Sequence, residues 1–86
     1  MTEPNNITLL GNLKVGYEGQ IRGFTSENSD ASDMIEQLRE MGFSEGLNVS
    51  ILHQNPFGRD PIAIRVGSMT IALRRNMANL IEVVAP

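Results

Sequence analysis

The sequence predicts a small, mostly β domain: a five-stranded barrel with one inserted α-helix and a short helical turn before the last strand. Several short runs alternate apolar and polar residues, which is the period of a half-buried strand. Glycines stand between these runs, where tight turns need them. One stretch changes to helical spacing. Closure into a barrel would remove the edges that a thin open sheet exposes.

The N-terminal part begins with a polar stretch, residues 1–6, which we expect to be a flexible tail ahead of a single domain over residues 7–86. Thr8 is suited to cap a short turn. Gly16 and Gly19 are predicted to form the next turn, which leads into a first strand over residues 20–24.

A helix is predicted between Asp30, its expected N-cap, and Gly42, its expected stop. Gly42 suits the left-handed conformation that follows a helix, and Phe43 is positioned to pack back on Leu38 as in a Schellman motif. The predicted apolar face consists of Met34, Ile35, Leu38 and Met41.

Strands dominate the second half of the chain. Gly46 is predicted to complete a type II turn, after which the period becomes two. Gly67 and Ser68 fit a two-residue hairpin with glycine at its first central position. The predicted strands cover residues 49–54, 62–66, 69–73 and 81–84. A short polar turn, residues 74–79, precedes the last of them.

Composition excludes several classes of protein. The 86 residues contain no cysteine, so neither a disulfide nor a thiolate metal site is expected. The net charge is −3 and only Arg74 and Arg75 form a basic cluster, which argues against nucleic-acid binding. No signal peptide and no apolar run near the roughly 20 residues of a membrane span is present, so we expect a cytoplasmic protein without direct membrane insertion.

Catalytic motifs are missing as well. The chain has one histidine, His53, and no glycine-rich phosphate loop with its lysine, so we predict no enzyme activity and no cofactor. Metal binding at His53 would need further ligands, and the nearest in sequence are Asn55 and Asp60. A strand histidine with a local hydrogen bond is the simpler interpretation, and no metal site is predicted; weak binding at His53 stays open.

Two segments are candidates for protein binding. The loop over residues 55–61 combines two prolines, an aromatic ring and a charged pair, and the end of the helix combines an apolar edge with an arginine. Each has a structural alternative: a rigid hairpin connection with Phe57 folded onto the rim, and a simple helix stop. We hypothesise one docking face formed by both. Its residues are Leu38, Arg39, Met41, Phe43, Pro56, Phe57, Gly58, Arg59 and Asp60.

The order of several short motifs covers almost the entire chain. They are Leu9 and Leu13 before Gly16 and Gly19, residues 38–43 followed by Gly46, Pro56-Phe57-Gly58 before Asp60-Pro61, Val66-Gly67, residues 71–74, and Ala78, Ile81 and Val83. In this order and spacing the chain resembles the FeoA family and the similar SH3-like domain appended to some metal-dependent repressors, which implies an SH3-like barrel. The chain departs from the family pattern at Gln37, where arginine is frequent, and at Glu45, where proline is frequent.

The resemblance implies a cytoplasmic accessory or regulatory module of bacterial ferrous-iron uptake. Its implied partner is the cytoplasmic GTP-binding domain of a ferrous-iron permease. Two other functions stay open: a metal-responsive regulatory domain that binds a divalent ion or a repressor partner, and a small barrel associated with the ribosome or RNA. Homo-oligomers are compatible with an exposed barrel edge.

Overall fold

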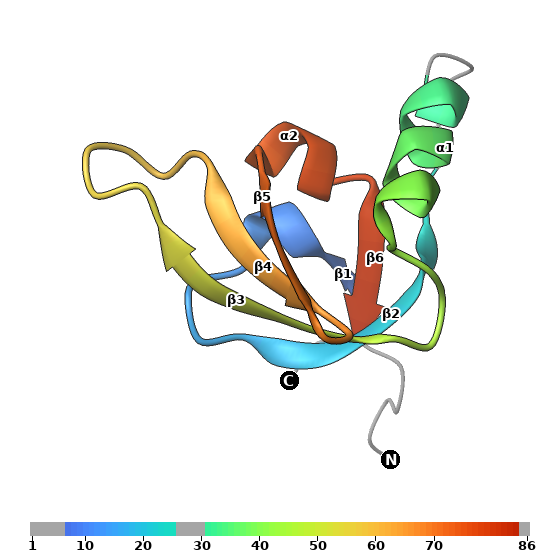
Figure 1. Cartoon of the computed structure of the whole chain (residues 1–86), viewed down its shortest axis with the longest axis horizontal. Coiled ribbons are helices and arrows are strands. Elements are labelled where there is room, and N and C mark those ends of the chain that lie inside the picture. The colour runs from blue at the N-terminus through green and yellow to red at the C-terminus, as the bar shows by residue number, and fades with distance from the viewer. Residues whose placement is uncertain (1–6, 26–30, 85–86) are drawn as a thin grey trace.

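The computed structural model describes residues 7–25 and 31–84, which form one antiparallel sheet with two short helices and a 3₁₀ turn (Figure 1). The strand order is β1-β6-β2-β3-β4-β5. In chain order the elements are β1 (Ile7–Leu9), η1 (Leu10–Asn12), β2 (Glu18–Phe24), α1 (Ala31–Met41), β3 (Asn48–Gln54), β4 (Ile62–Val66), β5 (Met69–Leu73), α2 (Arg75–Ala78) and β6 (Ile81–Val84). The mostly β prediction with one inserted helix is confirmed. No helix in these ranges is long and apolar enough to span a membrane.

One strand is additional to the predicted set. Thr8, expected to cap a turn, lies in β1 and pairs with Val83 of β6. A three-residue strand carries almost no alternating pattern of its own, and its partner lies at the other end of the chain. Local sequence therefore gave no signal for this pairing.

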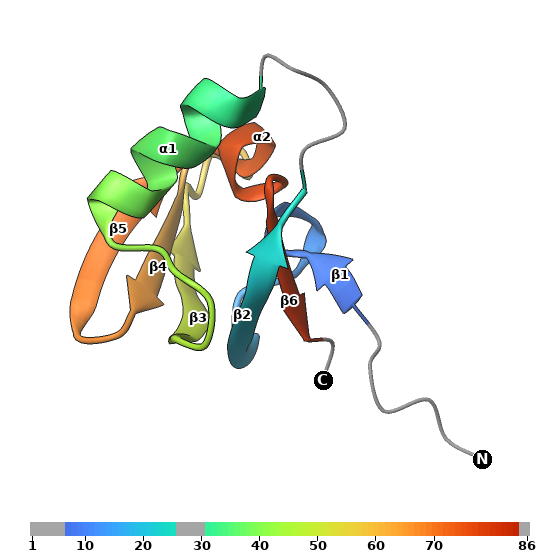
Figure 2. The same cartoon turned by 90° about the vertical axis from the view of Figure 1, so that its right-hand side faces the viewer.

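The sheet is curved but not closed. Its two outer strands are β1 and β5, and they lie at opposite sides of the molecule, with α1 and α2 over one end of the strands (Figure 2). The predicted closure between strands is thus absent from the described residues. Two edges remain, of three residues in β1 and five in β5.

Alternating residues of the strands build a single core. In β4, Ile62, Ile64 and Val66 are buried while Arg65 between them is exposed. The same core receives Leu10 from η1, Leu38 from α1 and Ala78 from α2, which explains why these short elements are held on the sheet.

The end of α1 follows the predicted Schellman geometry. Gly42 has φ +117°, its N–H donates to the Arg39 carbonyl at 3.1 Å, and the Phe43 N–H donates to the Leu38 carbonyl at 3.0 Å. Leu38 and Phe43 are fully buried, so their contact closes the helix against the core. The predicted N-cap, Asp30, lies outside the described residues.

The predicted apolar face of α1 is wrong in part. Leu38 is buried, but Met34 and Met41 are 41% and 36% exposed. The helix therefore packs through a narrow stripe, to which Ala31 also belongs, and leaves two methionines in contact with water.

The backbone conformations of the predicted turn glycines confirm all of these turns except the one at Gly19. Gly16, Gly46 and Gly67 have φ of +102°, +90° and +58°, a region in which glycine avoids the steric cost of a side chain. Gly19, predicted as a turn residue, instead lies inside β2. A Cβ there would collide with the Tyr17 hydroxyl, which donates a 2.5 Å hydrogen bond to the Val84 carbonyl. Gly19 thus makes room for the buried tyrosine.

The role of Gly19 can be tested by substitution within one strand. Gly19→Ala should lower the free energy of unfolding by about 1–3 kcal/mol, because the methyl group displaces Tyr17 from its hydrogen bond. Gly23→Ala, in the same strand, meets nothing closer than 3.8 Å and should change stability far less. Chemical denaturation of both variants measures the difference, and equal effects would contradict this role.

Candidate protein-binding site

The loop between β3 and β4, residues 55–61, is ordered by its own hydrogen bonds. The Asn55 side-chain oxygen accepts from the Phe57 N–H at 2.9 Å, which forms an Asx turn. The Asn55 N–H donates to the Pro61 carbonyl at 3.1 Å, and the Gly58 N–H donates to the Asn55 carbonyl at 3.3 Å. The tip of the hairpin is therefore a defined turn.

This turn holds Phe57 in solvent. The side chain is 97% exposed, whereas Phe43 is fully buried. The alternative that Phe57 folds onto the barrel rim is therefore wrong. Burial of a phenylalanine side chain is worth about 1.5–3 kcal/mol, and this stabilisation is not realised at Phe57 in the isolated chain.

Arg75 fastens the base of the same loop. This residue of α2 is 9% exposed, and all three guanidinium nitrogens donate hydrogen bonds. Nε donates to the Arg59 carbonyl at 2.9 Å, and Nη2 donates to Gln54 Oε1 at 2.9 Å. Nη1 donates to the carbonyls of Gly11 and Leu13 at 3.0 and 2.8 Å. One side chain thus joins α2 to η1, to the end of β3 and to the loop.

The acceptors of this guanidinium are neutral oxygens. Burial lowers the pKa of Arg75, and the nearby charge of Arg59 lowers it further, whereas Asp60 opposes this change. Arginine stays protonated in proteins, so its burial is tolerated because each nitrogen has an acceptor. Sequence analysis missed this residue, because an arginine in a polar turn carries no local sign of burial.

Asp60 has a structural task that the sequence did not reveal. One carboxylate oxygen accepts a 2.7 Å hydrogen bond from the Arg75 N–H, at the first residue of α2. A carboxylate near a helix N-terminus satisfies a backbone donor that has no partner inside the helix. We therefore reassign Asp60 from the predicted partner contacts to the fastening of the loop, while Pro56, Gly58 and Arg59 are exposed around Phe57.

A shallow hollow of about 380 Å³ lies beside Phe57 on the outer face of the sheet. Ala63 and Ala72 face each other across β4 and β5, and His53 faces Ala63 across β3 and β4. The short side chains of the two alanines leave space beneath the loop, and the lining of the hollow is mainly apolar. The lining also includes Pro56, Phe57, Pro61 and Ile62.

The other candidate, the end of α1, does not offer the predicted contacts. Leu38 and Phe43 are fully buried and cannot reach a partner without unfolding of the helix end. Arg39 is already engaged: both its terminal nitrogens bind the Glu45 carboxylate at 3.0 Å, and its guanidinium lies 4.5 Å from the centroid of the Phe24 ring. Met41 alone of the apolar candidates is partly exposed there.

The pairing of Arg39 with Glu45 occurs at a position where the chain departs from the family pattern. The hydrogen bond from Arg39 lowers the pKa of the Glu45 carboxyl, and the hydrogen bond to Glu45 raises that of Arg39. Glu45 therefore neutralises the one cation of the helix end that the sequence had assigned to a partner.

The two candidate segments do not adjoin. Figure 1 shows the β3–β4 loop at one end of the long axis and the last turn of α1 toward the other end, on the far side of β5. The hypothesis of one docking face formed by both segments is therefore wrong. Of the two, only the β3–β4 loop presents an unengaged aromatic side chain.

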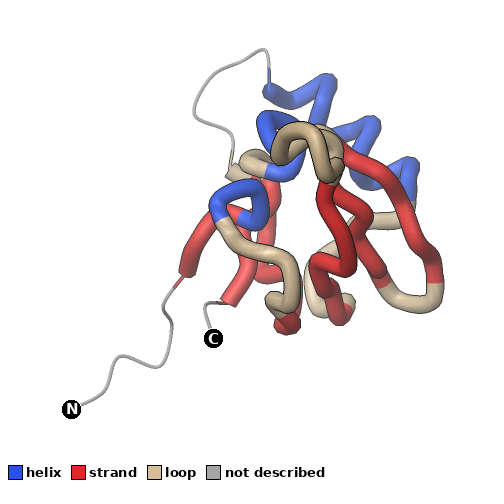
Figure 3. Tube along the Cα trace, turned by 90° about the vertical axis from the view of Figure 1, so that its left-hand side faces the viewer, coloured by secondary structure: helices blue, strands red, loops and turns tan. Residues whose placement is uncertain are grey.

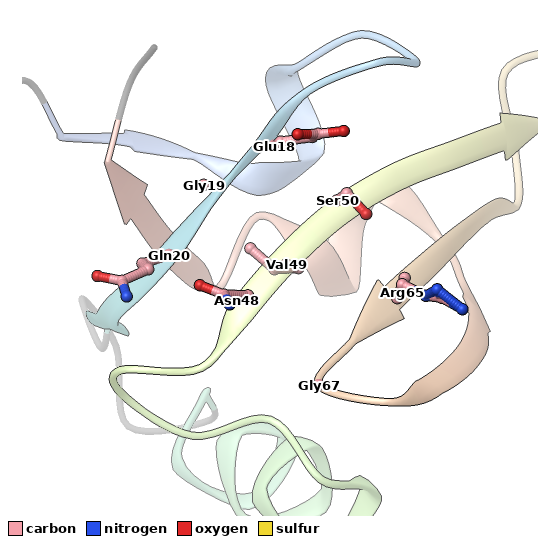
Figure 4. A pocket seen from close by; sticks show the side chains of 8 residues that line it. All are labelled: Glu18, Gly19, Gln20, Asn48, Val49, Ser50, Arg65 and Gly67. Carbon is pink, nitrogen blue, oxygen red and sulfur yellow. The ribbon is translucent and has the colours of Figure 1, made fainter.

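A second hollow, about 500 Å³, lies over β2, β3 and β4 (Figure 4). Glu18 and Arg65 are the charged residues on its wall, and Ser50 stands between them in the sheet register. No ion pair joins Glu18 to Arg65 in the described ranges. The surface is polar and open, and its groups do not converge on one point.

Metal ligands do not gather in the described part of the chain. Residues 7–25 and 31–84 contain no group of three or more His, Cys, Asp or Glu side chains placed to hold an ion. His53 is exposed at the end of β3.

Comparison with known proteins gives a family and a fold. The FeoA domain model matches residues 8–85. An FeoA-like protein from Clostridium acetobutylicum is 25% identical with a TM-score of 0.78, over 99% of this chain and 90% of that one. FeoA from Stenotrophomonas maltophilia, a prokaryotic SH3-domain protein solved with zinc, is 25% identical with a TM-score of 0.74, over 88% of each chain.

Repressor proteins share the fold. A manganese-dependent transcriptional repressor superimposes with a TM-score of 0.78 over 95% of this chain and 43% of its own, at 20% identity. This identity supports the shared architecture alone. No curated protein sequence matches the chain. The predicted SH3-like fold is confirmed by these structures, with the sheet left open in the present chain.

Removal of the Arg75 side chain tests its role in the site. Arg75→Ala should lower the free energy of unfolding by about 3–5 kcal/mol, because four hydrogen bonds that join α2 to three other segments are lost and the buried Gly11 carbonyl keeps no donor from this side chain. Arg74→Ala, at the exposed neighbouring position, should change it by less than about 0.5 kcal/mol. Urea denaturation compares the two, and a small loss for Arg75→Ala would contradict the assigned role.

Proposed function

Because the chain belongs to the FeoA domain family, we propose that it is a cytoplasmic accessory module of ferrous-iron uptake that regulates an iron permease. In this proposal the β3–β4 loop docks on the cytoplasmic GTP-binding domain of the permease. The chain acts by binding and carries out no chemistry of its own. An SH3-like fold hosts many functions, so the argument for docking depends on the surface of this chain.

One observation carries the proposal: Phe57 is 97% exposed on a loop that is held in a single shape. Aromatic side chains that enter a pocket of the partner supply much of the energy of protein interfaces. A loop that is already ordered loses less conformational entropy on binding. Exposure and order together favour a contact residue over a residue that merely failed to pack.

Neighbouring groups complete a plausible contact area. The hollow beside Phe57 accepts an apolar side chain, and the exposed Arg59 side chain offers charge-assisted hydrogen bonds at its rim. An apolar centre with a polar rim is the usual anatomy of a protein interface.

The alternative of a metal-responsive or repressor-binding domain has less support. The likeness to the manganese-dependent repressor is one of fold. Within residues 7–25 and 31–84, no cluster of metal-ligating side chains favours a resident ion. We therefore keep the docking function as the proposal.

Substitution of the exposed ring tests the docking site directly. Phe57→Ala should weaken binding to the purified full-length permease at least tenfold, about 1.4 kcal/mol or more, because the anchor side chain is lost. Its stability should stay within about 0.5 kcal/mol of the parent, since the ring packs on little in the free chain. Surface plasmon resonance with the permease in nanodiscs measures the affinity.

Arg39→Ala provides the matched control. Arg39 is an exposed residue of the other candidate segment, remote from the loop, and its loss should leave the affinity unchanged. Wild-type affinity of Phe57→Ala would refute docking through the loop. Loss of affinity in Arg39→Ala alone would move the site to the end of α1.

A further inference from the structure

β5 is an edge strand without the usual features that prevent pairing with another chain. β5 is the last strand in the sheet order, and the two side views of the molecule show it at the outer side of the sheet, opposite β1 (Figures 2 and 3). Natural edges are guarded by charges, proline or a bulge. Residues 69–73 contain no charge and no proline, and their register with β4 has no shift. In the described part of the chain, no backbone hydrogen bond reaches β5 from any other segment than β4.

The hairpin geometry determines which backbone groups point outward. A two-residue turn joins Val66 to Met69, so these two residues form the hydrogen-bonded pair next to the turn. Pairs alternate along an antiparallel ladder, which directs the N–H and C=O groups of Thr70 and Ala72 to the free edge. The Gly67 N–H donates to the Asn48 carbonyl, in agreement with this phase. An added strand would thus find two donors and two acceptors.

The apolar hollow lies immediately inside this edge. Ala72 lines it, and a residue opposite Ala72 on an added strand would stand roughly 5 Å away with its side chain on the same face. That side chain would enter the space between Ala72 and Phe57. Backbone pairing and the hollow therefore select the same extended ligand, with an apolar residue near its middle.

Charge indicates what flanks that apolar residue. Arg65 faces Thr70 across β4 and β5, and Arg74 follows the last residue of β5. Both are exposed, and neither side chain forms an ion pair or hydrogen bond with any described residue. Between residues 46 and 81 the only acidic side chain is Asp60, which serves Arg75. Arg65 and Arg74 thus find no unengaged acidic side chain within this stretch, although the chain as a whole is acidic.

A second copy of this chain fits the edge poorly. Antiparallel pairing of two β5 strands would bring Arg65 and Arg74 of both copies to one interface, where like charges repel. A ligand strand with carboxylates removes this conflict.

We propose that the free edge of β5 binds an extended acidic segment of the partner by strand addition. The segment pairs with Thr70 and Ala72 and places one apolar side chain in the hollow beside Phe57, with carboxylates near Arg65 and Arg74. The inference deepens the proposed function, since it assigns the chemistry of the partner segment that the loop recognises.

Hydrogen–deuterium exchange of the wild-type chain tests this directly, with the full-length permease in nanodiscs as the probe. Exchange at the Thr70 and Ala72 amides should slow at least tenfold in the complex, because strand addition occupies these donors. Unchanged exchange in a complex that still requires Phe57 would overturn strand addition and leave docking intact. Failure of the wild-type chain to bind the permease would overturn the docking function itself.

Two variants separate the backbone contact from other effects. Thr70→Pro removes an outward N–H and keeps the β4–β5 ladder, so it should weaken permease binding at least tenfold. Thr70→Val keeps the N–H and should bind as the parent. The charge reversal Arg74→Glu gives an independent variant at an exposed position: it should also weaken binding, more strongly at low salt. Parent affinity in Thr70→Pro and Arg74→Glu, or a self-association lost in Thr70→Pro, would overturn the proposal.

Discussion

The burial of one charged side chain organises the end of the molecule that carries the β3–β4 loop. Arg75 lies where four segments meet, and its four side-chain hydrogen bonds and its backbone N–H leave little freedom to any of them. A guanidinium is held away from water only when acceptors surround it, so these segments must keep their relative positions as long as the domain is folded. The β3–β4 loop is one of them. Its shape is therefore a consequence of the core and not of the loop sequence alone.

This constraint explains why an exposed phenylalanine can be part of a stable domain. The loop cannot collapse to bury Phe57, because its base is tied to α2 and its tip is closed by Asn55. The apolar hollow beneath it remains open for the same reason. At the end of α1, in contrast, the corresponding side chains have partners within the chain. Glu45 and the Phe24 ring contact Arg39, and Phe43 is buried in the core. In the proposed function, recognition is thereby concentrated on one end of the sheet.

Local sequence predicted the elements well and the site only in part. The alternation of apolar and polar residues in 62–66 and the glycine after α1 determine local backbone structure through residues close in sequence. β4 and the end of the helix could therefore be predicted. The pairing of β1 with β6, the space that Gly19 leaves for Tyr17 and the burial of Arg75 depend on residues far apart in sequence. Phe57 was recognised as a candidate, but its exposure could be decided only by the folded structure.

The central claim is that Phe57, held in solvent by the Arg75-anchored loop, contacts the permease. Photocrosslinking in living cells tests it most directly, with benzoylphenylalanine incorporated at position 57 and, as a reference, at the exposed Met34 on α1. The account predicts a crosslinked product with the iron permease from position 57 and none from position 34. A permease crosslink from position 34 alone, or none from either position while both variants remain folded, would contradict it.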